Sequence, residues 1–214
     1  MMKLAYAKCF ILVFVVLINK GLAQDSIKST SKGGGPLAAE FLVGTKGVAA
    51  RLNASKKIKS ISKLGYLTVT NVFGGWDDAK NFRLMHQSYL SYEVVKNISG
   101  HMGFHVTPET GFRPSFSLSY SYKHKDLMIS IVPRIDIFKN PNLEVLGFIE
   151  YEPFLLKDWK LYMQVIGLYG ENLTSGNHSR SYFYGRLGVN YKDIVFGLGY
   201  NFDRYGPKKV TVDN

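Results

Sequence analysis

Charged side chains at alternating positions are the first candidates for a functional site in this sequence. Both signs occur, so side chains of this kind on one face of a sheet would form ion pairs or line a path for a small solute. In a β-barrel that spans a membrane, the polar face of each strand is the lumen. The predicted lumen-lining residues are Arg51, Glu93, Arg113, Arg134, Asp136, Glu144, Glu150, Lys160 and Arg186. Two interpretations stay open: a ladder of ion pairs that fills or stiffens the lumen, and a selectivity lining.

Hairpin geometry predicts which of these charges meet. The predicted pairs are Arg113 with Asp136, Arg134 with Glu144 on a diagonal, and Glu150 with Lys160. The same register sets Asp136 against Glu144, which is unfavourable unless an arginine lies between the two carboxylates. Opposite charges across neighbouring strands stabilise a sheet by about 0.2–1 kcal/mol per pair, so each pair would make a modest contribution.

His86 and Ser88 are the weak candidates for catalysis. They share a strand face with apolar residues that we assign to lipid, and their Cα atoms would lie ~7 Å apart. A serine nucleophile needs its base within hydrogen-bond reach and a third group behind the base. The only acid nearby on this strand, Glu93, faces the other way. We therefore expect no enzymatic activity, and an acid close to His86 in the folded chain would favour the alternative of a lipid-modifying hydrolase.

The remaining histidines do not predict a metal site. His101 and His105 lie four residues apart on one strand face, which separates them by ~13 Å and prevents them from sharing a metal ion directly. His124 and His178 fall in predicted turns or loops. No metal and no cofactor are therefore expected.

Long alternating strands are the elements that must position these residues. Apolar or aromatic residues alternate with polar ones over Phe112–Tyr122, and after a polar break at Lys123–Asp126 the pattern resumes over Leu127–Ile137. Successive side chains of a strand point to opposite faces, so this stretch predicts a long β-hairpin with one apolar and one polar face. Strands of about ten residues with this pattern are typical of a transmembrane β-barrel.

The first residues are typical of a secretory signal peptide. Lysines precede a short apolar run, Cys9–Ile18, and small residues at Gly21–Ala23 offer a cleavage site. Residues 1–23 are therefore predicted to be a signal peptide, residues 24–35 a flexible periplasmic leader, and residues 36–214 one outer-membrane barrel domain.

Composition limits the kinds of binding partner that can be expected. The formal net charge is +11, but no basic run carries a nucleic-acid motif, so nucleic acid is not expected as a partner. A lipid bilayer with anionic head groups fits this charge, and small solutes are a further candidate. The single cysteine, Cys9, lies in the predicted signal peptide, so no disulfide is expected in the mature chain.

Turn positions predict the strand number and the polarity of the barrel. Short or basic turns are predicted near Asn97, His124, Leu155 and Lys192. Longer connections are predicted near Trp76, Glu171 and Arg204. The two kinds fall at opposite ends of an up-and-down meander. About eleven strands can be counted, and closure of such a barrel calls for an even number. The predicted fold is therefore an all-β, closed, antiparallel barrel of about twelve strands (ten to twelve), with Val210–Asn214 as a last strand that is cut short unless the count is wrong.

Two alternating stretches, Phe112–Tyr122 and Ile194–Phe202, and the two kinds of turn make the chain similar to a known class of membrane proteins. From Pro36 onward, together with the signal peptide, the chain resembles bacterial outer-membrane β-barrel proteins of the small porin-like kind, although it lacks their terminal aromatic residue. The resemblance implies the outer membrane of a Gram-negative bacterium, and a porin-like passive channel or a structural role. The other alternative, a soluble secreted barrel that binds a lipophilic ligand, would place the apolar face inward and the arginines outward.

Overall fold

The structure, a computed structural model, describes residues 12–15, 37–76 and 82–213. It is all-β. The strands are β1 (Leu12–Val15), β2 (Leu37–Val43), β3 (Gly47–Ile58), β4 (Ile61–Gly75), β5 (Arg83–Val95), β6 (Ile98–Thr107), β7 (Gly111–His124), β8 (Leu127–Asp136), β9 (Asn142–Tyr151), β10 (Phe154–Leu156), β11 (Trp159–Asn172), β12 (Asn177–Tyr191), β13 (Ile194–Tyr205) and β14 (Val210–Asp213). The part of the chain described here contains no helix that is long and apolar enough to cross a membrane.

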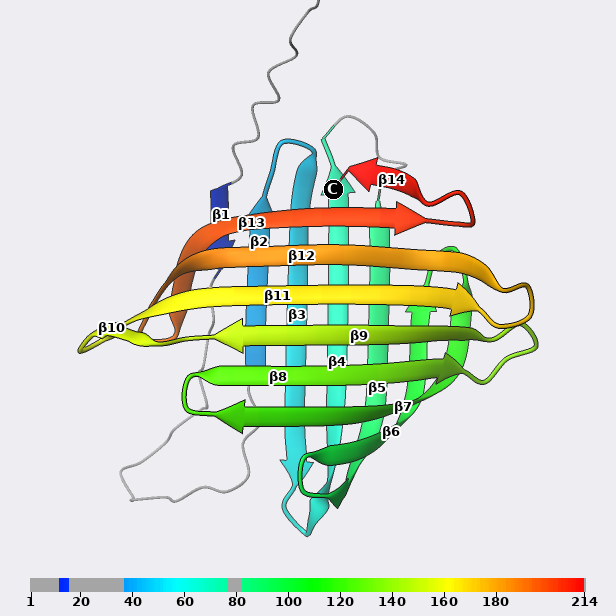
Figure 1. The fold of residues 1–214 in the computed structure, drawn as a ribbon, viewed down its shortest axis with the longest axis horizontal. Coiled ribbons are helices and arrows are strands. Elements are labelled where there is room, and N and C mark those ends of the chain that lie inside the picture. The colour runs from blue at the N-terminus through cyan, green and yellow to red at the C-terminus, as the bar shows by residue number, and fades with distance from the viewer. Residues whose placement is uncertain (1–11, 16–36, 77–81, 214) are drawn as a thin grey trace, which may run out of the picture.

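The strands form one antiparallel meander. Each long strand pairs with the next along the chain, except that β9 pairs with β11 because the three-residue β10 pairs only with β11. Of the 14 strands in the sheet, β1 and β10 stand apart from this succession, which leaves twelve. Figure 1 shows β8 to β13 crossing in front of β2 to β5, so the barrel has two layers whose strands run in different directions. The predicted fold class, an all-β antiparallel barrel of about twelve strands, is confirmed.

The ring has one seam, between β2 and β13. Eleven strands lead from β2 to β13, and because this number is odd the two edge strands run in the same direction. The four-residue β1 lies antiparallel between them, with Val13 opposite both Leu42 and Gly197. Further along the same edge, β14 pairs with Phe202–Tyr205. Among the described residues no strand covers the edge of β13 at Leu198–Asn201, so the barrel is nearly closed but not sealed.

Two predicted segments bear on this seam. The strand β1 falls within residues 1–23, the predicted signal peptide, so cleavage there would remove it from between β2 and β13. The predicted leader, residues 24–35, lies outside the described residues. The domain boundaries thus stay predictions.

The two faces of the strands differ as the alternation predicts. On β7, Phe116, Leu118 and Tyr120 are exposed on the outside, whereas Ser115 and Ser117 are buried on the inside. The same pattern runs around the barrel, because paired residues share a face from strand to strand. The exterior is therefore apolar and the interior polar, which is the reverse of what a soluble ligand-binding barrel requires.

Turn chemistry separates the two ends of the barrel. At one end, which we call the turn end, the hairpins are tight, and positive φ angles at Asn97, Lys125, Lys192 and Asp193 give the backbone twist that two-residue hairpin turns need. The β3–β4 turn at residues 59–60 also lies at this end. Trp76 and Phe82, and the connections at residues 173–176 and 206–209, lie at the other end, which we call the loop end. The named connections lie at opposite ends as predicted, but their lengths do not divide cleanly, because residues 44–46 and 108–110 are short turns at the loop end and residues 152–158 form a long connection at the turn end.

Interior glycines allow neighbouring strands to approach each other closely. Gly188 lies opposite Gly197 on neighbouring strands. A Cβ atom at Gly197 would lie 2.2 Å from the carbonyl oxygen of Leu187, and one at Gly188 would lie 2.2 Å from that of Phe196. No side chain fits at such distances, so these positions permit a backbone approach that only glycine allows.

Candidate functional site in the barrel interior

The polar interior brings together all of the charged residues that the alternation singled out. The structure places on the interior face Arg51, Glu93, Arg113, Arg134, Asp136, Glu144, Glu150, Lys160 and Arg186. They do not form one continuous ladder. They gather into separate clusters, each of which joins two or more strands by ion pairs and hydrogen bonds.

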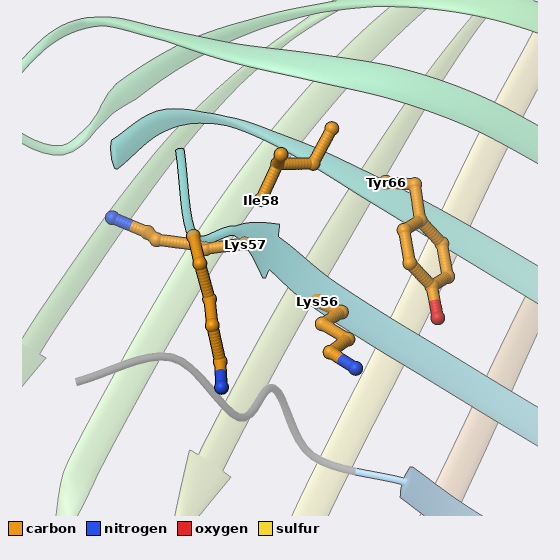
Figure 2. A pocket seen from close by; sticks show the side chains of 5 residues that line it. Lys56, Lys57, Ile58 and Tyr66 are labelled. Atoms are coloured by element: carbon orange, nitrogen blue, oxygen red, sulfur yellow. The ribbon is translucent and has the colours of Figure 1, made fainter. Parts of the chain in front are cut away.

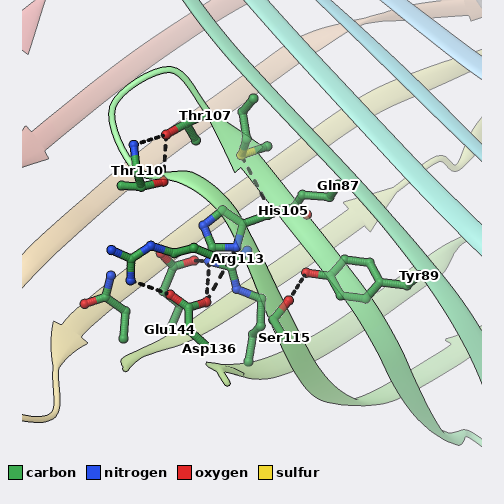
Figure 3. A network of polar contacts seen from close by, with 12 residues as sticks. Gln87, Tyr89, His105, Thr107, Thr110, Arg113, Ser115, Asp136 and Glu144 are labelled. Carbon is green, nitrogen blue, oxygen red and sulfur yellow. Dashed lines mark hydrogen bonds and ion pairs between the residues drawn. The ribbon is translucent and has the colours of Figure 1, made fainter. Parts of the chain in front are cut away.

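The first cluster surrounds Asp136 near the loop end (Figure 3). Its carboxylate, which is wholly buried, lies 3.3 Å from Arg113 Nη1 and 3.8 Å from Arg134 Nη2. Arg134 Nη2 also lies 2.8 Å from Glu144 Oε2, so one guanidinium stands between two carboxylates. His105 Nδ1 is 3.5 Å from Asp136 Oδ1. This cluster ties β6, β7, β8 and β9 together.

The predicted pairs of this cluster are largely found, with a shift in register. Arg134 lies directly opposite Glu144 rather than on a diagonal, and it does separate Glu144 from Asp136. Asp136 lies opposite Ser115, so Arg113 reaches it diagonally. The predicted turn has four residues, 123–126, whereas the β7–β8 hairpin has a two-residue turn at 125–126. Each residue of β8 therefore faces a β7 residue two positions further along the chain than predicted.

Several polar atoms in this cluster have no hydrogen-bond partner among the described residues. They are Nε and Nη1 of Arg134, Nε of Arg113, Nδ1 of His105 and Oδ1 of Asp136. A buried charged group without a partner costs free energy unless water or a ligand satisfies it. The cluster is thus polar enough to hold small polar species, and its side chains retain hydrogen-bonding capacity toward them.

The second cluster bridges the seam. Glu40 of β2 forms an ion pair with Arg51 of the adjacent β3, at 3.4 Å, and another with Arg186 of β12. Arg186 lies opposite Gly199 of β13, which has no side chain to stand between the arginine and β2. Arg186 Nη1 also donates a hydrogen bond of 2.8 Å to Asn201 Oδ1. Side chains therefore join the two edges of the seam on its interior side.

The third cluster was not predicted. Arg180 Nη2 lies 2.7 Å from Asp203 Oδ1, and Tyr184 donates a hydrogen bond of 2.9 Å to Asp203 Oδ2. Tyr205 and Tyr182 stack against the Arg180 guanidinium at about 5 Å. The signal was present in the sequence, because the two-residue turn at Lys192–Asp193 places Tyr182 opposite Asp203 and Arg180 diagonal to it.

Charges near the turn end form smaller groups. Glu150 lies opposite Gln164 and accepts its hydrogen bond at 3.0 Å, so the predicted pairing of Glu150 with Lys160 is wrong. The cause is β10, which lengthens the connection before β11 and moves the register. Lys160 instead lies 3.8 Å from Glu152, a residue of that connection. Burial raises the pKa of the Glu152 carboxyl above its ordinary value, and the neighbouring Glu150 raises it further.

His86 and Ser88 lie on the outer face, as predicted, and they are not linked to each other by a hydrogen bond in the described structure. His86 Nδ1 lies 2.9 Å from Thr70 Oγ1, and its ring lies 6.1 Å from that of Phe104. The group that contacts the imidazole is thus a hydroxyl, not the acid that a hydrolase would use to orient its base.

The interior histidines serve the polar network. His101 Nε2 lies 2.8 Å from Ser119 Oγ, and His105 belongs to the Asp136 cluster. Within the described ranges, no three His, Cys, Asp or Glu residues come together in a way that could hold a metal ion.

Comparisons with known proteins add little to these observations. No protein-family model matches the chain, and no curated protein sequence matches it. Among solved structures, the chain is similar to the outer-membrane expressed OmpT of Vibrio cholerae, with a TM-score of 0.37 and 13% sequence identity over 95% of this chain and 91% of that one. The assignment of an antiparallel barrel rests on the strand pairing described above.

Proposed function

We propose that the protein is a non-enzymatic β-barrel of the outer membrane of a Gram-negative bacterium. The mature chain inserts into this membrane after the signal peptide is removed. In this proposal the interior clusters hold the barrel closed and give it a structural role. The observation that carries it is the combination of an apolar exterior with charged side chains that are buried inside.

The exterior supports a membrane location. Large apolar and aromatic side chains face outward on every long strand, among them Leu90, Met102, Leu118, Ile131 and Leu187, with 44–64% of their surface exposed. A soluble monomer rarely exposes a contiguous apolar surface of this extent. Strands of 10 to 15 residues from β3 to β13, apart from β10, are also long enough to cross a bilayer at a tilt. The lipid bilayer is thus the proposed partner of the outer face.

The interior supports a barrel whose lumen is filled by side chains. The side chains of Asp136 and Asp203 have no exposed surface, and Arg134 and Arg186 are 8% and 7% exposed. Charges that lined a wide aqueous pore would be open to solvent. A barrel of twelve strands lies between fully packed eight-strand barrels and wide porins, so packing by long polar side chains can fill it.

A narrow porin-like passage is the second candidate. It is favoured by the buried nitrogen and oxygen atoms around Asp136 that have no hydrogen-bond partner among the described residues, which are groups that a passing ion or small polar solute could contact. In this version the ion pairs of the Asp136 cluster form the constriction. Passive passage would require them to rearrange, and the transported species would be small and polar.

Conductance of the refolded mature chain in a planar bilayer tests both versions. The structural version predicts stable insertion with little conductance, and an increase when two of the side chains that fill the interior are removed by the double substitution Arg134→Ala and Glu144→Ala. Lys139→Ala, in an exposed turn at the loop end, is the control and should leave conductance unchanged.

The outcomes separate the candidates. Large conductance steps in the unaltered chain would overturn the closed barrel and favour the porin-like passage. Hydrolysis of bilayer lipid that disappears on changing Ser88 or His86 to Ala would overturn the non-enzymatic assignment. Failure to insert into lipid at all would overturn the membrane location.

A further inference from the structure

The β3–β4 hairpin at the turn end carries a cluster of lysines that the interior networks do not use. The stretch from Lys56 to Lys63 contains four lysines and no acidic residue. An open pocket of about 340 Å³ lies at this hairpin, lined by Lys56, Lys57, Ile58, Lys59 and Tyr66 (Figure 2). It combines ammonium groups, one phenol and an apolar side chain on two adjacent strands.

The two faces of the hairpin divide these lysines. Lys57 is on the interior face, and its Nζ lies 2.8 Å from Glu93 Oε2, so its charge is paired. Lys56 is on the outer face, directly opposite Tyr66 on the neighbouring strand. Lys56 and Lys59 are exposed, and neither has a carboxylate partner among the described residues. Two ammonium groups are thus available to an outside ligand.

The hairpin presents these groups at the level of a membrane surface. In a barrel that spans a bilayer, the outward residues nearest the turn lie at the interface between hydrocarbon and water. Tyrosine is enriched at that level because its ring is apolar and its hydroxyl is polar, and lysine extends its ammonium toward the head groups. Figure 2 shows the side chains of Lys56 and Tyr66 on the two neighbouring strands of the hairpin.

We propose that the pocket formed by Lys56, Lys59 and Tyr66 binds the phosphate of an anionic phospholipid head group in the leaflet at the turn end. The ammonium groups pair with the phosphate, the Tyr66 hydroxyl donates a hydrogen bond to it, and Ile58 contacts the glycerol and first acyl carbons. This inference rests on the proposed membrane location, and it names the class of lipid that binds at one site on the barrel surface.

Lipid retention by the mature chain in phosphatidylcholine nanodiscs doped with phosphatidylglycerol is the test, read by native mass spectrometry. The double substitution Lys56→Ser and Lys59→Ser should weaken phosphatidylglycerol retention roughly thirtyfold, because each lysine that pairs directly with the head-group phosphate contributes a factor of about five. Lys96→Ser with Lys157→Ser removes the same charge from other turns at the same end and should change retention by less than about twofold.

Three outcomes decide the proposal. Equal losses in the two double variants would overturn it, because diffuse attraction to the basic turn end would then account for the binding. Displacement of the lipid by inorganic phosphate at a concentration no higher than that of the lipid would also overturn it, since the site would then prefer a free anion. Loss confined to the Lys56 and Lys59 variant, with a smaller loss for Tyr66→Ala, would support it.

Failure of the membrane location itself can be told apart from failure of this site. Insertion is measured first for every variant, by protection of the strands from protease in the same nanodiscs. A chain that does not insert contradicts the proposed function, whereas a chain that inserts but retains phosphatidylglycerol equally in all variants contradicts only the lipid site.

Discussion

Arg186 of β12 forms an ion pair with Glu40 of β2, although β13 lies between these two strands. The arginine passes Gly199, which has no side chain, and Glu40 is shared with Arg51. One carboxylate therefore serves two guanidinium groups at the seam between β2 and β13.

Glu40→Gln tests the importance of this carboxylate. The substitution leaves Arg51 and Arg186 without their counter-charge, and removal of one partner of a buried ion pair costs about 3–5 kcal/mol. We expect the free energy of unfolding, measured by urea titration of the chain in lipid vesicles, to fall by about 3 kcal/mol. Glu109→Gln, in an exposed turn, is the control. A loss no larger than that of the control would contradict the seam assignment.

Gly197→Ala tests the close approach of β12 and β13. A Cβ atom there would lie 2.2 Å from the carbonyl oxygen of Leu187, so the backbone must move, at a cost of about 1–3 kcal/mol. Gly147→Ala is the matched control, because the nearest atom to a Cβ there is 4.0 Å away. We expect the alanine at 197 to lower the urea midpoint and the alanine at 147 to leave it nearly unchanged. Equal effects would refute the close approach.

A double-mutant cycle on Arg134 and Glu144 measures how strongly the Asp136 cluster couples the strands. We expect an interaction free energy of about 1–3 kcal/mol, because both side chains are largely buried and 2.8 Å apart. The same cycle on Lys57 and Glu93, an exposed pair at the same distance, should give less than about 1 kcal/mol. Similar coupling in both pairs would show that the interior is open to solvent.

Glu152→Gln should reduce the dependence of stability on pH. Because burial raises the pKa of this carboxyl in the folded chain, the folded state favours the protonated form. The stabilising contribution of protonation is fully present below the ordinary value of 4.5 and is lost as the pH rises through the folded value. Glutamine mimics the protonated form and can still accept the hydrogen bond of Asn190.

The measurement is the urea midpoint of both chains at acid and at neutral pH. We expect the variant to match the unaltered chain at acid pH and to exceed it at neutral pH. If the variant is instead less stable at neutral pH, then the ion pair with Lys160, at 3.8 Å, outweighs the cost of burial.

Local sequence patterns were sufficient for the long strands and for some of the contacts between neighbours. The alternation over Phe112–Tyr122 predicts β7 and its faces because side chains of a strand alternate by geometry alone. The pair Arg134 and Glu144 followed from one turn. Errors arose where turn geometry decides the register: positive φ at Lys125 shortens one turn, and β10 lengthens another. A two-residue turn also defined the Arg180 and Asp203 contact, which was overlooked.

The contact between Glu40 and Arg186 belongs to a different class. These residues are 146 positions apart, and no hairpin brings them together. They meet only because the sheet curls into a ring. A pattern read one strand at a time contains no information on that closure.

The seam also has a consequence for how quickly the molecule forms. Every strand pairing from β2 to β13 joins neighbours in the chain, so each can form as a hairpin with a short loop to close. The joint between β2 and β13 alone requires ends separated by most of the domain to find each other, and such non-local contacts slow folding. We expect an open, curved sheet to accumulate first during refolding into lipid, and ring closure to set the rate of the final step.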